Sequence, residues 1–273
     1  MIYKSFLPTP SLKEFVRNYT IINLKFSPDE PIPFKERSPK TEQKIVFYLK
    51  DPPIIHNSAT GKAETPSPVS IFSHQLERRT FEMKYEFLAL VIFLQPGVLH
   101  RLIRLPMLEL RDKICDAELF FGSEVSSIRD ELALAACQTE MIHVAEQFLL
   151  PQCRQLPTKS SIDRIALEIL DKPTSFSLDT IARQACLSSK QFYRRFTDRV
   201  GIGPKLFSRL ARFNHAYQYK INHPAVSWSS IAQEFQYTDY HHMEKEFKEF
   251  TSLTPRQWTM THLSAPERIL NLR

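Results

Sequence analysis

The spacing of apolar residues changes along the chain. Up to about residue 110, short apolar runs with strand-like alternation are separated by proline-rich breaks. Two runs lie at 44–49 and 69–72, and a longer one from Thr80 to Leu94 alternates before it becomes continuously apolar. From Glu124 to Leu149, apolar residues recur at helical spacing, which predicts one helix. After Ser161 the pattern predicts short helices with clear start signals.

These patterns divide the chain into two parts. Its 273 residues suffice for two ordinary domains, and Pro151 and Pro157 bracket a short polar stretch that suits a linker. We therefore expect an α+β protein with a mixed α/β domain over 1–150, a linker over 151–160, an all-α domain over 161–262 and a tail over 263–273. The longest uninterrupted apolar run, Phe87 to Leu94, is far shorter than the roughly 20 residues of a membrane span, so no membrane partner is expected. Four cysteines without a Cys-x-x-Cys pair indicate reduced thiols in a cytoplasmic protein.

The C-terminal half contains two copies of one pattern, offset by about fifty residues. The matching pairs are Ile181-Ala182 with Ile231-Ala232, Phe192 and Phe196 with Met243 and Phe247, and Gly201-Ile-Gly-Pro204 with Ser252-Leu-Thr-Pro255. A nearly constant offset across several features indicates one supersecondary unit used twice. Each copy is predicted to form a helix, a tight turn and a second helix, and Ser188-x-x-Gln191 is a capping box for the second helix of the first copy.

A single helix is predicted between the copies, from Pro204 to Ile221. Its length is about 18 residues, or roughly 27 Å at 1.5 Å per residue. Successive major grooves on one face of a duplex lie about 34 Å apart. A rigid spacer of this length could therefore place two reading helices in adjacent grooves.

The charge distribution supports the same division. Residues 1–157 carry equal numbers of acidic and basic side chains, so residues 158–273 account for the whole net charge of +6. Basic residues dominate between Arg183 and Arg212, where Asp198 is the single acidic residue. A polyanionic partner of the second half would explain this pattern, but a solvated helical face would explain it equally well.

The duplicated unit resembles the AraC family of bacterial transcription regulators. The matching residues are Ser177-Leu-x-x-Ile-Ala, Ser188-x-x-x-Phe-x-Arg194-x-Phe196, Gly201-x-x-Pro204, Phe207, Arg212, Ala216, Ile231-Ala232, Tyr237-x-Asp239, Phe247 and Thr254-Pro255-x-x-Trp258. The resemblance covers roughly residues 161–262. Gln236 and Ser252 stand where the family usually has glycine, and we expect Gln236 to make the second turn less tight. The N-terminal half is similar to the effector or oligomerisation domain of one branch of the family, in Phe93-Leu-Gln-Pro-Gly97, 102–107 and Phe120-Phe-Gly122.

This resemblance implies a regulator that binds double-stranded promoter DNA and contacts RNA polymerase, as an activator or as a repressor. It further implies that the N-terminal domain binds a small-molecule effector or a protein partner and forms a homodimer. No cofactor is implied.

The resemblance also assigns roles to two reading helices, 189–200 and 240–250. The base-reading positions are Lys190, Tyr193 and Arg194 in the first copy, and Tyr240, His241, His242, Glu244 and Lys245 in the second. The phosphate-binding positions are Ser189, Arg195, Thr197 and Arg199. Arginine can donate two parallel hydrogen bonds to guanine, although Arg194 could instead form a salt bridge within the bundle. Because 239–250 holds four acidic and two basic residues, we expect the second copy to contribute less affinity.

Motifs of catalysis and of metal binding are missing from the sequence. It has no His-x-x-x-His pair and no Gly-x-Ser-x-Gly elbow, so we expect neither an enzyme nor a metal site. Some relatives repair DNA through a reactive cysteine, but Cys153 lacks the adjacent histidine of such a site, and Cys115 and Cys186 are expected to be buried and inert. The alternative function is a protein-interaction module of helix-turn-helix ancestry with little or no specific DNA binding.

Overall fold

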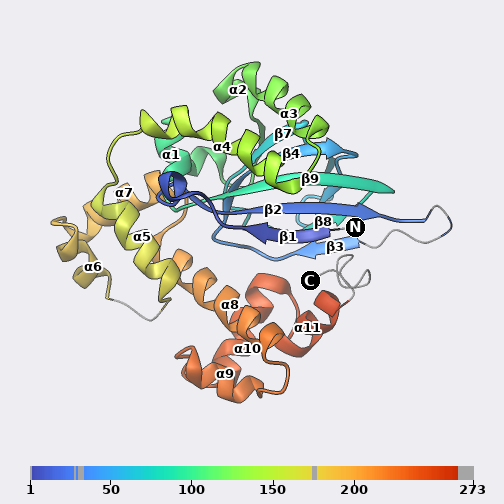
Figure 1. The fold of residues 1–273 in the computed structure, drawn as a ribbon. Helices are drawn as coiled ribbons and strands as arrows, with labels where there is room; N and C mark the ends of the chain where they lie inside the picture. Colours follow the sequence, from blue (N-terminus) through green and yellow to red (C-terminus); the bar gives the residue numbers. More distant parts are fainter. Residues whose placement is uncertain (1, 28, 30–33, 174–176, 264–273) are drawn as a thin grey trace.

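The computed structural model describes residues 2–27, 29, 34–173 and 177–263. The expected tail lies outside these residues except for Leu263. A strand-rich N-terminal part precedes a helical C-terminal part (Figure 1), and the chain has the expected α+β fold.

The N-terminal part is built on two antiparallel sheets. The first has six strands in the order β1 (Ile2–Phe6), β2 (Val16–Lys25), β9 (Glu86–Leu94), β4 (Gln43–Lys50), β7 (Val69–Phe72) and β10 (Ile114–Asp116). The second has four strands in the order β3 (Phe34–Arg37), β8 (Arg79–Glu82), β5 (Ile54–Asn57) and β6 (Ala63–Glu64).

The six-stranded sheet is covered on both faces. Along β4, Ile45 and Phe47 belong to the core on the helical side, whereas Val46 and Tyr48 belong to the core shared with the second sheet. The same alternation holds in β9, and two buried faces explain why its sequence is continuously apolar. The single strand expected from Thr80 to Leu94 is wrong, because β8 and β9 belong to different sheets and residues 83–85 join them.

Helices cover the outer face of this sheet (Figure 1). They are α1 (Val98–Ile103), α2 (Glu118–Phe121), α3 (Glu124–Leu134) and α4 (Gln138–Arg154), together with the short 3-10 turns η1 (Pro10–Leu12) and η2 (Met107–Leu110). The single helix expected over 124–149 is wrong, since the backbone at Ala135 and Cys137 leaves the helical region and separates α3 from α4. The expected linker also begins later, because Pro151 lies inside α4 and only residues 155–160 connect α4 to α5.

The C-terminal part is entirely helical. Its helices are α5 (Ser161–Asp171), α6 (Leu178–Gln184), α7 (Ser189–Val200), α8 (Pro204–Asn222), α9 (Trp228–Glu234), α10 (Tyr240–Thr251) and α11 (Pro255–Leu263). One hydrophobic core runs through both copies of the repeat and includes the fully buried Phe196, Phe213 and Phe247. The two copies therefore share this core and are joined by the 19-residue α8.

The two tight turns have the same geometry. Cys186 and Gln236 both adopt left-handed backbone conformations, with φ of 54° and 55°. The next residue then donates its amide to the preceding helix, Leu187 to the Ala182 carbonyl at 3.0 Å and Tyr237 to the Ala232 carbonyl at 2.9 Å. The prediction that the second turn is less tight than the first is therefore wrong. The extra residue of the second copy is Thr238, which follows the corner.

The cysteines differ from expectation in part. Cys186 is exposed at its turn and Cys115 is half-buried, so the prediction that both are buried is wrong. Cys153 is buried, and burial raises its thiol pKa to about 12, which makes it a poor nucleophile. In the described ranges, no cluster of three or more His, Cys, Asp and Glu side chains is arranged to hold a metal ion. No described helix is both long and apolar enough to cross a membrane.

Candidate nucleic-acid interface and interdomain cleft

The first reading helix, α7, is fixed by its cap and by its buried face. The Ser188 hydroxyl accepts from the Gln191 amide at 3.3 Å, and the Gln191 side chain accepts from the Ser188 amide at 3.2 Å. Phe192 and Phe196 are fully buried on the inner side. These contacts leave the predicted base-reading residues Lys190, Tyr193 and Arg194 on the exposed side.

The basic side chains on this exposed side are unpaired. Among the described residues, Lys190, Arg194 and Arg195 have no ion pair and no side-chain hydrogen bond. The salt bridge considered as the alternative role of Arg194 is therefore not found. Tyr193 is half-exposed, and its ring lies so close to Gly203 that a Cβ there would come within 2.9 Å of the hydroxyl.

The predicted phosphate-binding residues differ in their availability. Arg195 is exposed, whereas the Ser189 hydroxyl donates to Asp179 and the Thr197 hydroxyl donates to the Tyr193 carbonyl at 2.9 Å. Arg199 donates to both carboxylate oxygens of the buried Asp163, at 2.9 and 2.8 Å, and its side chain is 22% exposed. The phosphate role expected for Arg199 does not fit this geometry.

The second reading helix, α10, begins at Asp239, whose carboxylate accepts from the His242 amide at 2.7 Å. His242 and Lys245 are exposed, and His241 is exposed beside the Tyr240 ring. Glu244, another of the predicted base-reading residues, forms an ion pair with Lys248 at 3.4 Å.

The acidic residues of α10 are largely neutralised within the domain. Glu246 is 2% exposed and accepts from Arg209 at 2.9 Å, from Arg212 at 3.1 Å and from the Tyr237 hydroxyl at 2.9 Å. Glu249 pairs with Arg209 as well, and hydrogen bonds to these two carboxylates raise the pKa of Arg209. The negative charge counted in the sequence therefore faces inward more than it faces a bound polyanion.

The two reading helices border one hollow of about 800 Å³. Tyr193 lines it from α7, His242 and Lys245 from α10, and Lys205 and Arg209 from the first turns of α8. Of the predicted base-reading residues, Tyr193, His242 and Lys245 thus face the same region of space, whereas the others do not line the hollow. Sequence reasoning did not single out Lys205, although it lies in the basic stretch.

The N-terminal domain holds both reading helices at their carboxyl ends. The Gln43 side chain donates to the Val200 carbonyl at the end of α7, at 3.3 Å. Arg78 donates to the Thr251 carbonyl at the end of α10, at 2.9 Å. Its positive charge interacts favourably with the negative end of the helix dipole there.

Three further close contacts join the two domains. Gly201, in the left-handed region at φ 96°, lies against Met107 of η2. The rings of His74 and Phe207 meet at a centroid distance of 6.0 Å, and burial lowers the His74 pKa to about 4. Gly97 lies against the carboxylate of Asp163.

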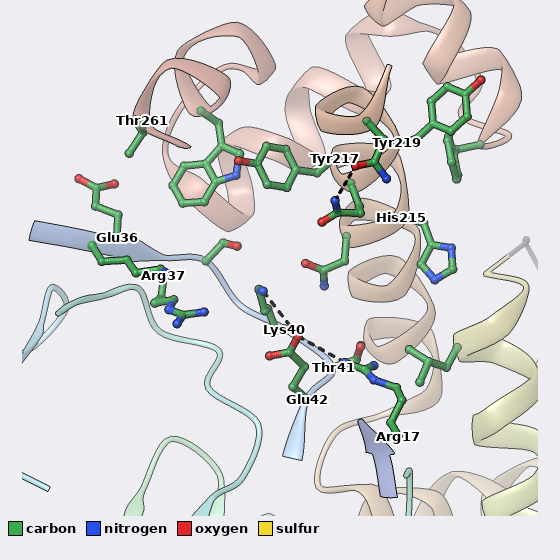
Figure 2. Close-up of a pocket in the computed structure, with 18 of the residues that line it drawn as sticks. Arg17, Glu36, Arg37, Lys40, Thr41, Glu42, His215, Tyr217, Tyr219 and Thr261 are labelled. Carbon is green, nitrogen blue, oxygen red and sulfur yellow. Dashed lines mark hydrogen bonds and ion pairs between the residues drawn. The ribbon is translucent and has the colours of Figure 1, made fainter. Parts of the chain in front are cut away.

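A polar cleft of about 500 Å³ separates the sheets from α8 and α11. Figure 2 shows Arg17, Lys40 and Glu42 on one wall and His215 on the other. Glu42 pairs with Arg17 and with Lys40, each at 3.5 Å. Burial opposes its ionisation, but the surrounding basic groups outweigh burial and lower its pKa to about 2.

An apolar cavity of about 200 Å³ between the two sheets adjoins this cleft. The side chains that line both spaces are Tyr3, Arg17, Lys35, Arg37, Lys40 and Glu42. Lys44 lines the inner cavity, with its Nζ 5.2 Å from the Phe72 ring and 5.7 Å from the Phe93 ring. Burial lowers the pKa of Lys44 to about 7, and no described carboxylate lies within ion-pair distance. The feature of the sequence that could have indicated this cavity is Lys44, a charged residue at a position of β4 that faces inward.

Residues 181–260 match a family model described as a helix-turn-helix domain. The match coincides with the duplicated unit. These residues therefore form a helix-turn-helix domain.

Crystal structures of ToxT from Vibrio cholerae share the fold over most of this chain. A ligand-free variant has a TM-score of 0.51 and 11% identity, covering 89% of this chain and 97% of ToxT. The wild-type protein bound to unsaturated fatty acid has a TM-score of 0.50 and 12% identity, covering 89% and 94%. No curated protein sequence matches the chain.

Proposed function

We propose that the chain is a transcription regulator of the AraC family that reads double-stranded DNA with α7 and α10 in adjacent major grooves, under the control of its N-terminal domain. The observation that carries the proposal is a hollow bordered by both reading helices, whose lining includes Lys205 and Lys245, which form no ion pair among the described residues. The 19 residues of α8 span about 28 Å, close to the roughly 34 Å between successive major grooves. The shared core would hold this spacing before DNA binds.

Base recognition by α7 rests on Lys190, Tyr193 and Arg194. Arg194 would donate to O6 and N7 of a guanine, and Lys190 would add a less directional donor. Arg195 and the free backbone amides at Ser189 and Lys190 would bind phosphates and set the register. In α10 the reading residues are those predicted from the sequence, with Lys245 the most available cation.

Control by the N-terminal domain would pass through the segment 40–43. Residues 40–42 line the interdomain cleft, and the adjacent Gln43 donates to the carbonyl at the end of α7. A small molecule in the cleft would shift this segment and with it the orientation of the first reading helix. ToxT, which shares the fold, has been crystallised with an unsaturated fatty acid. Contact with RNA polymerase and homodimer formation stay predictions.

The test compares Arg194→Ala with Arg195→Ala on a set of duplexes that differ at single positions of the selected site. Arg194→Ala should relax the preference at one base pair by roughly 1–3 kcal/mol. Arg195→Ala should weaken binding to all duplexes alike and reduce the salt dependence. An unchanged base preference in Arg194→Ala would contradict the assignment, and weak, salt-insensitive binding by the wild type would favour a protein-interaction module.

A further inference from the structure

The mouth of the inner cavity is rich in basic groups. Five basic side chains and a single acidic one are found among the described residues that line this cavity, and the acidic one, Glu42, already pairs with two of the basic ones. Lys44 and the Arg37 guanidinium contact aromatic rings, and Arg37 Nε is buried without a hydrogen-bond partner. Such a ring of cations fits an anionic group of a ligand.

The spaces on the two sides of this ring differ in chemistry. On the inner side, apolar side chains form the wall, among them Val46, Phe87 and Val91. On the outer side, the wall carries hydrogen-bonding groups of α8 and α11, in a space of about 500 Å³. A ligand that fills both spaces needs an apolar part and a polar part on opposite sides of its anion.

The outer wall has polar atoms that no described group satisfies. The Trp258 indole N–H is buried without a partner, and this side chain is 5% exposed. Gln218 donates to Asn222 at 3.2 Å, which leaves the Gln218 carbonyl oxygen and the Asn222 amide nitrogen available. Hydroxyl groups match this mixture, because each one both donates and accepts.

We propose that the cleft and the inner cavity form one site for a single-chain phospholipid, with its chain between the sheets, its phosphate at the basic ring and its hydroxylated head group against α8 and α11. A phosphodiester is the fitting anion because it carries substituents on both sides, whereas a carboxylate ends its chain and would leave the outer space to water. The head group would touch the DNA-binding domain directly. This inference deepens the effector control proposed above and rests on it.

The test is calorimetric titration of the full chain with three probes below their micelle concentrations. Dodecanoyl lysophosphatidylglycerol carries chain, phosphodiester and head group, dodecanoate lacks the head group, and glycerophosphoglycerol lacks the chain. The complete lipid should bind at least about tenfold more tightly than either partial probe, as one or two additional hydrogen bonds allow. Equal affinity for dodecanoate would overturn the head-group assignment and leave effector control by a plain acid standing.

Variants separate specific binding from adsorption. Gln218→Ala should lower the affinity for the complete lipid by about threefold to tenfold and leave the affinity for dodecanoate unchanged. Gln233→Ala, an exposed residue of α9 outside the cleft, should change neither affinity and serves as the matched control. Lys44→Met should lower the affinity for both the complete lipid and dodecanoate. Lipid binding that none of these substitutions alters would overturn the proposal, as would the absence of lipid binding, and DNA recognition is measured separately in the same preparations.

Discussion

Substitution of Gly97 by alanine tests the contact between the two domains. Gly97 has φ 79°, and an added Cβ would lie 2.0 Å from Oδ1 and 2.7 Å from Cγ of Asp163. That carboxylate cannot move aside, because Arg199 and the capping box of α5 hold both of its oxygens. The left-handed backbone costs alanine about 1–2 kcal/mol, and the overlap adds about 1–3 kcal/mol. The free energy of unfolding should therefore fall by roughly 2–5 kcal/mol.

Gly61→Ala supplies the matched control. Gly61 has φ 68°, but an added Cβ there meets nothing within 4 Å, so its cost is the backbone strain alone. The assay is urea denaturation of both variants and the wild type, followed by fluorescence. If Gly97→Ala destabilises the protein no more than Gly61→Ala does, the rigid docking of Gly97 on Asp163 is refuted.

Three further predictions concern the backbone and pH. Ser252→Gly should raise the free energy of unfolding by about 1 kcal/mol in urea denaturation, because Ser252 has φ 59°, and an unchanged or lower stability would contradict this strain. The pKa of His74 is about 4 in the folded protein and 6.5 in the unfolded chain, so the unfolded chain binds more protons between these two values. Acidification across this window should therefore lower the free energy of unfolding by up to about 3 kcal/mol. His74→Leu should lack that part of the pH dependence, and an unchanged slope in denaturation from pH 7 to 4 would count against it. Dodecanoate affinity should fall as pH rises through about 7, because the Lys44 ammonium, which faces Arg17, Arg37, Lys40 and Glu42, loses its proton there. Lys44→Met should lose this trend in calorimetry, and an unchanged trend would contradict the prediction.

The local architecture of the helix-turn-helix domain was predictable because its signals are local. Helix caps, a constant offset and four-residue spacing define the repeat, and α8 ends at Asn222, one residue beyond the predicted Ile221. The break between α3 and α4 was missed because apolar residues keep helical spacing across it. The β8–β9 break was missed for the same reason, since the alternation continues through residues 83–85.

The parts of the site that sequence reasoning missed depend on contacts between distant residues. Arg199 looks like a phosphate ligand in the sequence, and only its approach to Asp163, 36 positions earlier, removes it from that role. The cleft joins Arg17 and Lys40 to Gln218 and Trp258, which no local pattern connects. Likewise, the acidic character of α10 is a property of the sequence that Arg209 and Arg212 largely cancel in the fold.

Selection of a random duplex library on the full chain, at two salt concentrations, tests the central claim most directly. Reading by both helices predicts an enriched motif with two half-elements about one helical turn, or roughly 10 base pairs, apart. Its affinity should fall steeply between the two salt concentrations because bound phosphates release counterions. A single short element would contradict reading by α10, and the absence of enrichment at both salt concentrations would contradict sequence-specific DNA binding altogether.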